Sequence, residues 1–185
     1  LKEAAEQRSV NAQITAFADP VRKAAAATYG YGADTFPFIS PHSKDVIDQQ
    51  WGISPRQMMI NLGEAMRASD PEHWIKVWRQ FPFNSPKGDM IIVTDVRQFN
   101  EAAEVHAHGG TLALLQRPGV VWDGTSAEWL AHQCTQPQRS PLNAPPHGPF
   151  DVLVKNDGDV ASLRRHADRI VRRVLDKATK QNSSK

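Results

Sequence analysis

The sequence has little that would crosslink the chain or hold it in a membrane. Only one cysteine, Cys134, occurs among the 185 residues, which excludes an internal disulfide and favours a reducing compartment. No apolar stretch is long enough for a membrane-spanning helix. The net charge of +2 is small, so composition gives no argument for a nucleic-acid-binding protein. We therefore expect a soluble cytoplasmic protein with no membrane partner.

The length of the chain sets the expected number of domains. With 185 residues, of which 40% are apolar, the chain can build one domain with a real core and is short for two. We expect a single domain over residues 1–178 and a disordered tail over residues 179–185. A polar, proline-rich stretch over about residues 120–149 is longer than an ordinary connection, which predicts either a lid-like insertion or a disordered one.

The sequence alternates strand patterns with helix patterns. Capping side chains followed by proline at Asp19, Ser54 and Asp70 predict helix starts. Predicted helices run from Pro20 to Thr28, from Pro55, from Pro71, from Asn100 to His108, and from Asp159 onward; predicted strands cover Ala12–Asp19, Met90–Val96, Thr111–Pro118 and Phe150–Asp157. This order predicts an α/β layer fold with a mostly parallel sheet flanked by helices. Such sheets bind ligands beyond the carboxyl ends of their strands.

Asp95 and Arg97 lie at the carboxyl end of the most apolar predicted strand, Met90–Val96, which we expect to be central in the sheet. A carboxylate there could hold Mg²⁺ directly or through water, and an arginine could bind a phosphate with two parallel hydrogen bonds. The alternative is structural: Asp95 caps a turn and Arg97 pairs with Glu101.

Four segments, in this order, resemble the phage-type deoxynucleoside monophosphate kinase family: "AFADPVRKAA", "GISPRQMMINLGEAMRASDPEHWIKVW", "DMIIVTDVRQFNEAAEVHAHGGTLALLQRPG" and "FDVLVKNDGDVASL". The resemblance covers most of the chain and is weakest in the proline-rich stretch. It implies a three-layer fold of the P-loop NTPase type. It also implies transfer of the γ-phosphoryl group of ATP to a deoxynucleoside monophosphate (dNMP) with Mg²⁺, in a phage-infected or prophage-bearing bacterial cell.

The resemblance also implies roles for single residues. Asp95 would organise Mg²⁺, and Arg97 would contact the substrate phosphate. Arg117 and Arg139 would approach the transferring phosphoryl group from the lid. On the acceptor side the resemblance implies Asp19, Arg56, Glu64 and Arg67. Two segments depart from the family pattern, because its "GTEW" is "GEAM" here and its "H.SE" is "HQCT".

A kinase of this class needs the phosphate-binding loop G-x-x-x-x-G-K-[S/T], and the 185 residues contain no Gly-Lys pair. In the family this loop follows the first strand, which lies in the middle of the sheet. We therefore expect the first strand and the loop to be missing from this sequence, which leaves strand edges unpaired, and we expect little activity from these residues alone.

Other interpretations stay open. A noncatalytic nucleotide-binding or scaffold domain would keep the pocket without the loop. The basic segment Arg164–Arg173 could bind nucleic acid, although a solvated helix face explains it better. His106 and His108 are two residues apart on a predicted helix and point to different sides, which argues against a metal pair. Many kinases of this type are dimers, so a homodimer is one option.

Overall fold

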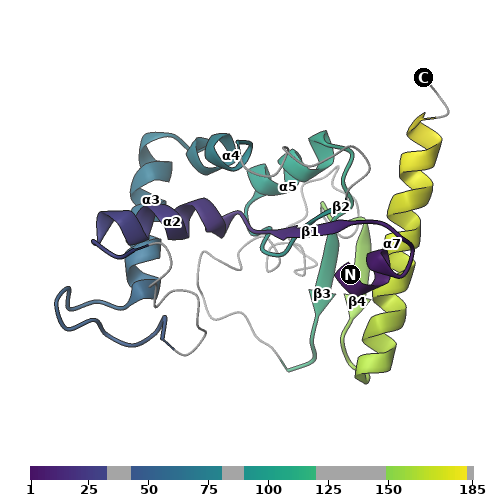
Figure 1. Cartoon of the computed structure of the whole chain (residues 1–185), viewed down its shortest axis with the longest axis horizontal. Coiled ribbons are helices and arrows are strands. Elements are labelled where there is room, and N and C mark those ends of the chain that lie inside the picture. The colour runs from purple at the N-terminus through teal and green to yellow at the C-terminus, as the bar shows by residue number, and fades with distance from the viewer. Residues whose placement is uncertain (33–42, 81–89, 120–148, 183–185) are drawn as a thin grey trace, which may run out of the picture. The chain divides into compact units, whose positions relative to one another are not determined.

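The computed structural model describes residues 1–32, 43–80, 90–119 and 149–182 (Figure 1). The chain divides into two compact units. The first comprises Leu1–Ile14 together with Pro86–Lys185, and the second is Thr15–Ser85. The expectation of one domain over residues 1–178 stays a prediction.

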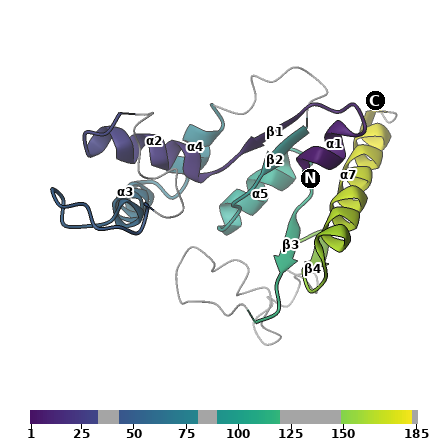
Figure 2. The same ribbon diagram turned by 60° about the horizontal axis from the view of Figure 1, so that its bottom comes forward.

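The first unit is α/β. Its elements are α1 (Lys2–Glu6), β1 (Ala12–Thr15, whose last residue opens the second unit), β2 (Met90–Val93), α5 (Phe99–Ala107), β3 (Ala113–Gln116), β4 (Val152–Lys155) and α7 (Val160–Asn182). The four strands form two small sheets, β1 with β2 and β3 with β4. Helix α7 runs beside β4 and packs against α1 (Figures 1 and 2). This arrangement confirms the α/β class and is compatible with a kinase-like fold.

Strands β3 and β4 are parallel, as predicted. Their register pairs Ala113 with Val152 and Gln116 with Lys155. Because parallel strands end at the same edge of a sheet, the segments after Gln116 and after Lys155 lie on the same side of the unit.

The strands are shorter than predicted, and side chains bind backbone N–H groups in the segments after β1 and β2. The Ala16 N–H, just after β1, donates to the Asp19 carboxylate at 2.9 Å. After β2, the Arg97 and Gln98 N–H groups donate to the Glu101 carboxylate at 2.7 and 3.0 Å. A backbone N–H that is engaged by a side chain cannot extend the ladder. Local side-chain capping therefore sets where β1 ends, and it fixes the loop that follows β2.

Strand β2 is not the buried central strand that its sequence predicts. In the described residues it pairs only with β1, and all four of its residues are half-buried. Its apolar composition is that of a strand covered on both faces, whereas among the described residues one of its edges has no partner strand.

Helix α5 ends close to the predicted His108, just before the glycine pair Gly109 and Gly110. Gly109 has φ +72°, the left-handed region that glycine adopts without strain. Its N–H donates to His106 O, and the Gly110 N–H donates to Val105 O at 2.9 Å. A β-carbon at Gly110 would lie 2.6 Å from Val105 Cγ1, so a side chain there does not fit.

Helix α7 begins with the predicted cap, since Asp159 Oδ1 accepts the Ser162 N–H at 2.7 Å. It continues to Asn182. Residues 179–182, which were predicted to belong to a disordered tail, are therefore helical. The Thr179 hydroxyl donates to Leu175 O at 3.0 Å. On the predicted apolar face Val171 is fully buried, whereas Val160 is 66% exposed.

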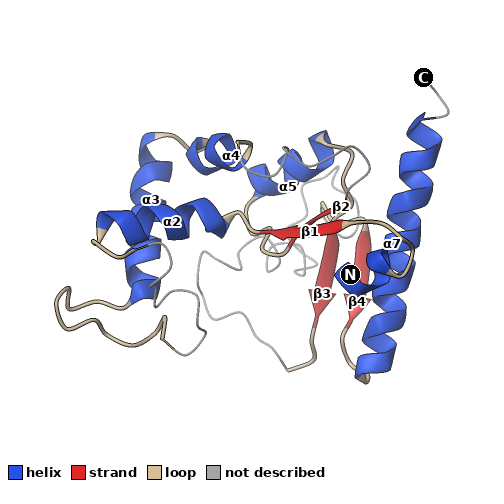
Figure 3. Cartoon of the chain, viewed as in Figure 1, coloured by secondary structure: helices blue, strands red, loops and turns tan. Residues whose placement is uncertain are grey.

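Apart from Thr15, the end of β1, the regular secondary structure described in the second unit is helical (Figure 3). It contains α2 (Ala18–Thr28), α3 (Pro55–Ser69) and α4 (His73–Trp78). Helix α3 starts with the predicted Ser54 cap and Pro55. Met58, Ala25 and Ala26 form a buried cluster between α2 and α3. Trp74, Ile75 and Trp78 are buried on α4.

Asp70 links α3 to α4 in a different way from the prediction. Its Oδ1 accepts the Glu72 N–H at 3.0 Å and its Oδ2 binds Lys76 Nζ at 2.7 Å. Helix α4 begins only at His73, with Glu72 as its N-cap. The aspartate therefore closes the turn between the helices, and the helix starts two residues after Pro71.

Asp151 ties the end of α5 to the start of β3. Its Oδ2 accepts the Leu112 N–H at 2.8 Å and lies 3.0 Å from His106 Nε2. Burial alone would raise the pKa of the Asp151 carboxyl, but the Leu112 N–H, His106 and the charge of Lys177 together hold it below its usual value. A depressed carboxyl pKa stabilises the fold above the unfolded pKa of about 3.9 and loses that contribution as the pH falls through the folded pKa.

We expect Asp151→Asn to lower the free energy of unfolding by about 1 kcal/mol at pH 7, since the carboxylate is partly screened by solvent. The difference from the parent chain should shrink below about pH 4, where the parent carboxyl takes up its proton. Urea unfolding at pH 7 and pH 3 measures both. A difference of equal size at the two pH values would contradict the role of the ionised carboxylate.

Candidate functional site

The predicted site residues fall in both units. Asp19, Arg56, Glu64 and Arg67 belong to the Thr15–Ser85 unit. Asp95, Arg97 and Arg117 belong to the other unit. Arg139 and the segment His132 to Thr135 lie outside the described residues. Each group is considered within its own unit.

Asp19 is held on both carboxylate oxygens. It lies in the first turn of α2, whose N-cap is Phe17, so the prediction of Asp19 as N-cap is two residues off. Its Oδ2 accepts the Ala16 N–H at 2.9 Å, and its Oδ1 lies 2.5 Å from Arg22 Nη1. The Asp19 carboxylate therefore caps the end of β1, and its ion pair fixes Arg22 on the same turn of α2.

Arg22 is a candidate that the sequence analysis missed. Its Nε is buried, and among the described residues no group accepts its hydrogen. The signal that could have revealed it is the spacing Asp-x-x-Arg at a helix start, which puts a guanidinium beside an acid one turn away. A guanidinium oriented by a carboxylate is well suited to binding an anion.

Arg56 is already paired. Its Nε lies 2.5 Å from Asp45 Oδ1 and its Nη2 3.2 Å from Asp45 Oδ2, both partly exposed. The hydrogen bond from Arg56 lowers the pKa of the Asp45 carboxyl. The pair ties the segment before α3 to the first turn of that helix, and the Arg56 N–H donates to Lys44 O at 2.8 Å.

Arg56 and Arg67 are eleven positions apart on α3, which is about 16 Å along the helix axis. With Arg56 held by Asp45, the two guanidinium groups are poorly placed to share one phosphate. Glu64 lies between them and is exposed. The predicted monophosphate pocket therefore centres better on Arg67 than on Arg56.

Arg67 lies over Gly63, at the place where α3 approaches α2. A β-carbon at Gly63 would be 3.3 Å from Arg67 Nη1 and 3.7 Å from Val21 Cγ1. The Gly63 carbonyl accepts a buried hydrogen bond from Trp74 Nε1 at 3.0 Å. The missing side chain thus lets the guanidinium lie near the first turn of α2. Asp19 and Arg22 lie two positions before and one position after Val21 on α2.

Asp95 and Arg97 follow β2 in the loop that leads into α5. Asp95 is half-buried and Arg97 is exposed. Glu101 does contact Arg97, but through the backbone N–H and not as the predicted side-chain ion pair. Glu101 is 4% exposed, and its Oε2 accepts both N–H groups that fix the loop. Among the described residues, no ion pair engages the Arg97 guanidinium.

Arg117 lines a pocket beyond the carboxyl ends of β3 and β4. The pocket has a volume of about 470 Å³. Its walls combine the Arg117 guanidinium, the polar loop Asn156–Asp159, and the apolar side chains of Pro118, Val160 and Leu163. A pocket at this edge is what parallel strands predict. Charged, hydrogen-bonding and apolar groups together match the parts of a nucleotide.

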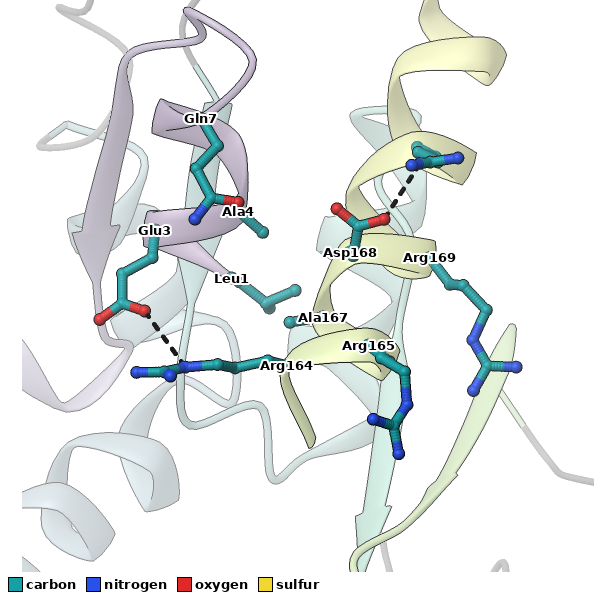
Figure 4. Close-up of a pocket in the computed structure, with 10 residues that line it drawn as sticks. Leu1, Glu3, Ala4, Gln7, Arg164, Arg165, Ala167, Asp168 and Arg169 are labelled. Atoms are coloured by element: carbon teal, nitrogen blue, oxygen red, sulfur yellow. Dashed lines mark ion pairs between the residues drawn. The ribbon is translucent and has the colours of Figure 1, made fainter. Parts of the chain in front are cut away.

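A larger surface pocket, of about 690 Å³, lies between α1 and α7 (Figure 4). Arg164 points toward Glu3, with Nε 3.9 Å from Oε2, whereas Arg165 and Arg169 point away from that pair (Figure 4). Asp168 pairs with Arg8 and Arg172. No predicted site residue lines this pocket. Its acids and arginines bind one another, which supports the interpretation of Arg164–Arg173 as a largely solvated helix face that also holds α1.

The two histidines of α5 and its C-cap do not form a metal pair. His106 Nε2 contacts Asp151, and His108 Nδ1 lies 3.0 Å from Glu104 O. Within the described ranges, no group of three His, Cys, Asp or Glu side chains could hold a metal ion. Asp95 as a Mg²⁺ ligand stays a prediction. In the same ranges no helix is long and apolar enough to cross a membrane.

Comparison with known proteins gives a distant relative. No protein-family model matches the chain. The chain is 27% identical over 123 residues to a protein of Acanthamoeba polyphaga mimivirus named "Putative deoxynucleotide monophosphate kinase". The match covers 59% of this chain and 63% of the mimivirus protein, so it spans less than two thirds of that relative. This similarity gives weak support to a nucleotide kinase.

Proposed function

We propose that the chain is the greater part of a deoxynucleoside monophosphate kinase, which transfers the γ-phosphoryl group of ATP to a dNMP. The observation that carries the proposal is the Arg117 pocket at the carboxyl ends of the parallel strands β3 and β4. The resemblance of four sequence segments and the mimivirus relative support the same function.

The Arg117 pocket fits one nucleotide. The guanidinium can lie on the face of a base or bind a phosphate oxygen. Asn156 and Asp157 offer hydrogen-bonding groups for a base edge, and Val160 and Leu163 offer an apolar surface. We assign this pocket to ATP, because it lies in the unit that also carries the loop with Asp95 and Arg97.

Phosphoryl transfer needs positive charge around a loose transition state. Arg97 is exposed in a loop that Glu101 fixes. Mg²⁺ commonly takes only one or two protein carboxylates and completes its shell with water and phosphate oxygens. A single half-buried acid, Asp95, fits that demand, and the ion would neutralise phosphate charge there.

We assign the acceptor dNMP to Asp19 and Arg22 of α2 and Arg67 of α3, two helices that pack against each other. The two guanidinium groups supply charge for a monophosphate, and Asp19 keeps Arg22 oriented at 2.5 Å. The described residues place no carboxylate within ion-pair distance of Arg67, so its charge is available to a ligand. Arg56 would contribute mainly by fixing the start of α3.

Titration calorimetry with dAMP, dCMP, dGMP and dTMP tests the acceptor assignment on the 185-residue chain. We expect at least one of them to bind, and Arg67→Ala to weaken that binding by about tenfold or more, because a charge-assisted contact is lost. Arg67→Lys should weaken it less. Arg165→Ala, on an exposed turn of α7, is the matched control and should change nothing.

Two results would count against the proposal. One is that none of the four monophosphates binds, and the other is that Arg67→Ala binds as tightly as the parent chain. These residues contain no G-x-x-x-x-G-K-[S/T] segment, so we expect negligible ATP-dependent transfer from them alone. Monophosphate binding without ATP binding would favour the noncatalytic alternative.

A further inference from the structure

Helix α7 concentrates positive charge on one element. It contains seven arginines and lysines and two aspartates, whereas the net charge of the whole chain is only +2. The rest of the chain is therefore net acidic. The net charge of the chain does not reveal this difference, because it averages the helix with everything else. A partner responds to the local charge of the surface that it meets.

Some of these cations have structural partners. Arg164 Nε lies 3.9 Å from the Glu3 carboxylate, and Arg172 Nε lies 3.0 Å from that of Asp168. Lys177 Nζ donates at 3.0 Å to a backbone carbonyl in the connection after α5. These contacts fix α7 in the unit, and they account for the three side chains without any external partner.

Arg165, Arg169 and Arg173 differ, and we call them the basic row. All three are exposed. Among the described residues no carboxylate lies within ion-pair distance of any of them. Arg169 Nη2 donates to His166 Nδ1 at 2.9 Å, which orients the guanidinium and leaves its charge uncompensated. Arg165 and Arg169 both point away from the Glu3–Arg164 pair (Figure 4).

The basic row follows one side of the helix. Its members are four positions apart, so they succeed one another at steps of about 6 Å along the axis. From Arg165 to Lys180 the basic side extends about 22 Å. Its C-terminal part borders a surface pocket of about 490 Å³, which is lined by five cations and one acid: Arg169, Arg172, Arg173, Lys177, Lys180 and Asp176.

Two ordinary explanations do not account for the basic row. The helix dipole favours cations in the last turn, but Arg165 lies in the second turn of α7. A solvated helix face usually places an acid four positions from each base. Here the steps from Arg165 to Arg169, to Arg173 and to Lys177 all join two cations. Such pairs repel each other in the free helix, and a bound anion relieves that repulsion.

The surroundings of the row identify the kind of anion. The opposite side of α7 is packed in the unit, where Val171 is fully buried, so the helix has no free apolar face to enter a membrane. It contains no Phe, Trp or Tyr, which are the side chains that stack on the bases of a single strand. Guanidinium groups bind phosphate oxygens with two hydrogen bonds. A regular array of phosphates therefore fits the row best.

We propose that Arg165, Arg169 and Arg173 bind the phosphate backbone of duplex nucleic acid without reading its sequence. The 22 Å of the basic side span about six phosphates of one strand, at about 3.4 Å for each. The proposed kinase function does not absorb these residues, and this inference does not depend on it.

Fluorescence anisotropy of the 185-residue chain with a fluorescein-labelled DNA duplex of mixed sequence tests the proposal. We expect saturable binding at low salt, with the logarithm of the affinity falling linearly as the logarithm of the salt concentration rises. Replacing all three arginines of the basic row by glutamine should weaken binding by about tenfold or more. It should also reduce the slope by about 3, because each lost phosphate contact contributes about 0.9.

Two further variants separate the basic row from net charge. Lys2, Lys23 and Lys155 are exposed and lie outside α7, so replacing these three by glutamine removes the same charge. This variant should keep a slope within about 1 of that of the parent chain. Lysine at all three positions of the row keeps the charge and loses the paired hydrogen bonds. It should keep the slope and bind less tightly than the parent.

Four outcomes would overturn the proposal. The first two are that the parent chain does not bind the duplex at low salt, and that the glutamine variant of the row keeps the affinity and the slope. The third is an equal loss in the charge-matched variant, which would mean a diffuse attraction. The last is a preference of more than about tenfold for a single strand or for phosphatidylserine vesicles over the duplex. Circular dichroism should show the parental helix content in every variant, because the substituted side chains are exposed.

Discussion

Trp74→Ala is expected to lower the free energy of unfolding of the Thr15–Ser85 unit by about 3–5 kcal/mol. Trp74 is 4% exposed, and its removal leaves a cavity beside the buried Ile75 and Trp78. It also removes the hydrogen bond from Nε1 to Gly63 O. Since that contact lies where α2 meets α3, the position of Arg67 depends on it.

Trp74→Phe separates packing from hydrogen bonding. It keeps an aromatic ring and loses the N–H, so the expected loss is smaller, about 1–3 kcal/mol for the unpaired Gly63 carbonyl and the reduced volume. Urea unfolding followed by circular dichroism measures both variants. A loss below about 1 kcal/mol for Trp74→Ala would show that the indole does not anchor this unit.

Glu101→Ala is expected to cost the α/β unit about 3 kcal/mol. The buried carboxylate accepts two backbone N–H groups, from Arg97 and Gln98, and charge-assisted bonds of this kind contribute more than neutral ones. Without it both donors lose their acceptor, and the loop that carries Asp95 and Arg97 loses its anchor. We expect the Arg97 and Gln98 amides to exchange much faster.

Glu101→Gln is the matched control, because its amide oxygen can still accept a backbone N–H. We expect it to retain part of the stability, with a loss of about 1–2 kcal/mol. Urea unfolding and amide exchange give the two readouts. If Glu101→Ala leaves the exchange of the Arg97 and Gln98 amides unchanged, the loop is fixed by something other than this side chain.

The sequence predicted best what depends on neighbouring residues. The Ser54 cap with Pro55, the Asp159 cap and the end of α5 at Gly109 are all seen in the structure. Each needs only a side chain and a backbone group within about one turn, so local chemistry decides it. The helices near Asp19 and Asp70 start at other residues than predicted. Those two carboxylates bind backbone N–H groups in the turns next to the helices.

Contacts between residues that are far apart in the sequence could not be predicted. Asp151 meets the Leu112 N–H across 39 positions and His106 across 45, and no local pattern marks either pair. The position of Arg67 over Gly63 could not be predicted either, because the only sign of it in the sequence is a glycine within a helix. Met90–Val93 was rightly predicted as an apolar strand, but periodicity gives no information on which strands lie beside it.

The candidate site was predicted in part for the same reason. Asp95 and Arg97 were found because they end an apolar strand. Arg22 was missed, although it lies three residues after Asp19, because one ion pair at a helix start is common on protein surfaces. Its buried Nε, visible only in three dimensions, distinguishes it.

The pairing of β1 with β2 has a consequence for how the chain folds. Asn11 and Met90 are hydrogen-bonded neighbours, yet the whole Thr15–Ser85 unit lies between them in sequence. Closing so long a loop while it is flexible costs entropy before any ladder bond is formed. If the helical insert folds first, the loop is already compact when the strands meet. The rate at which β1 joins β2 should therefore follow the folding of a segment that contributes almost nothing to their sheet.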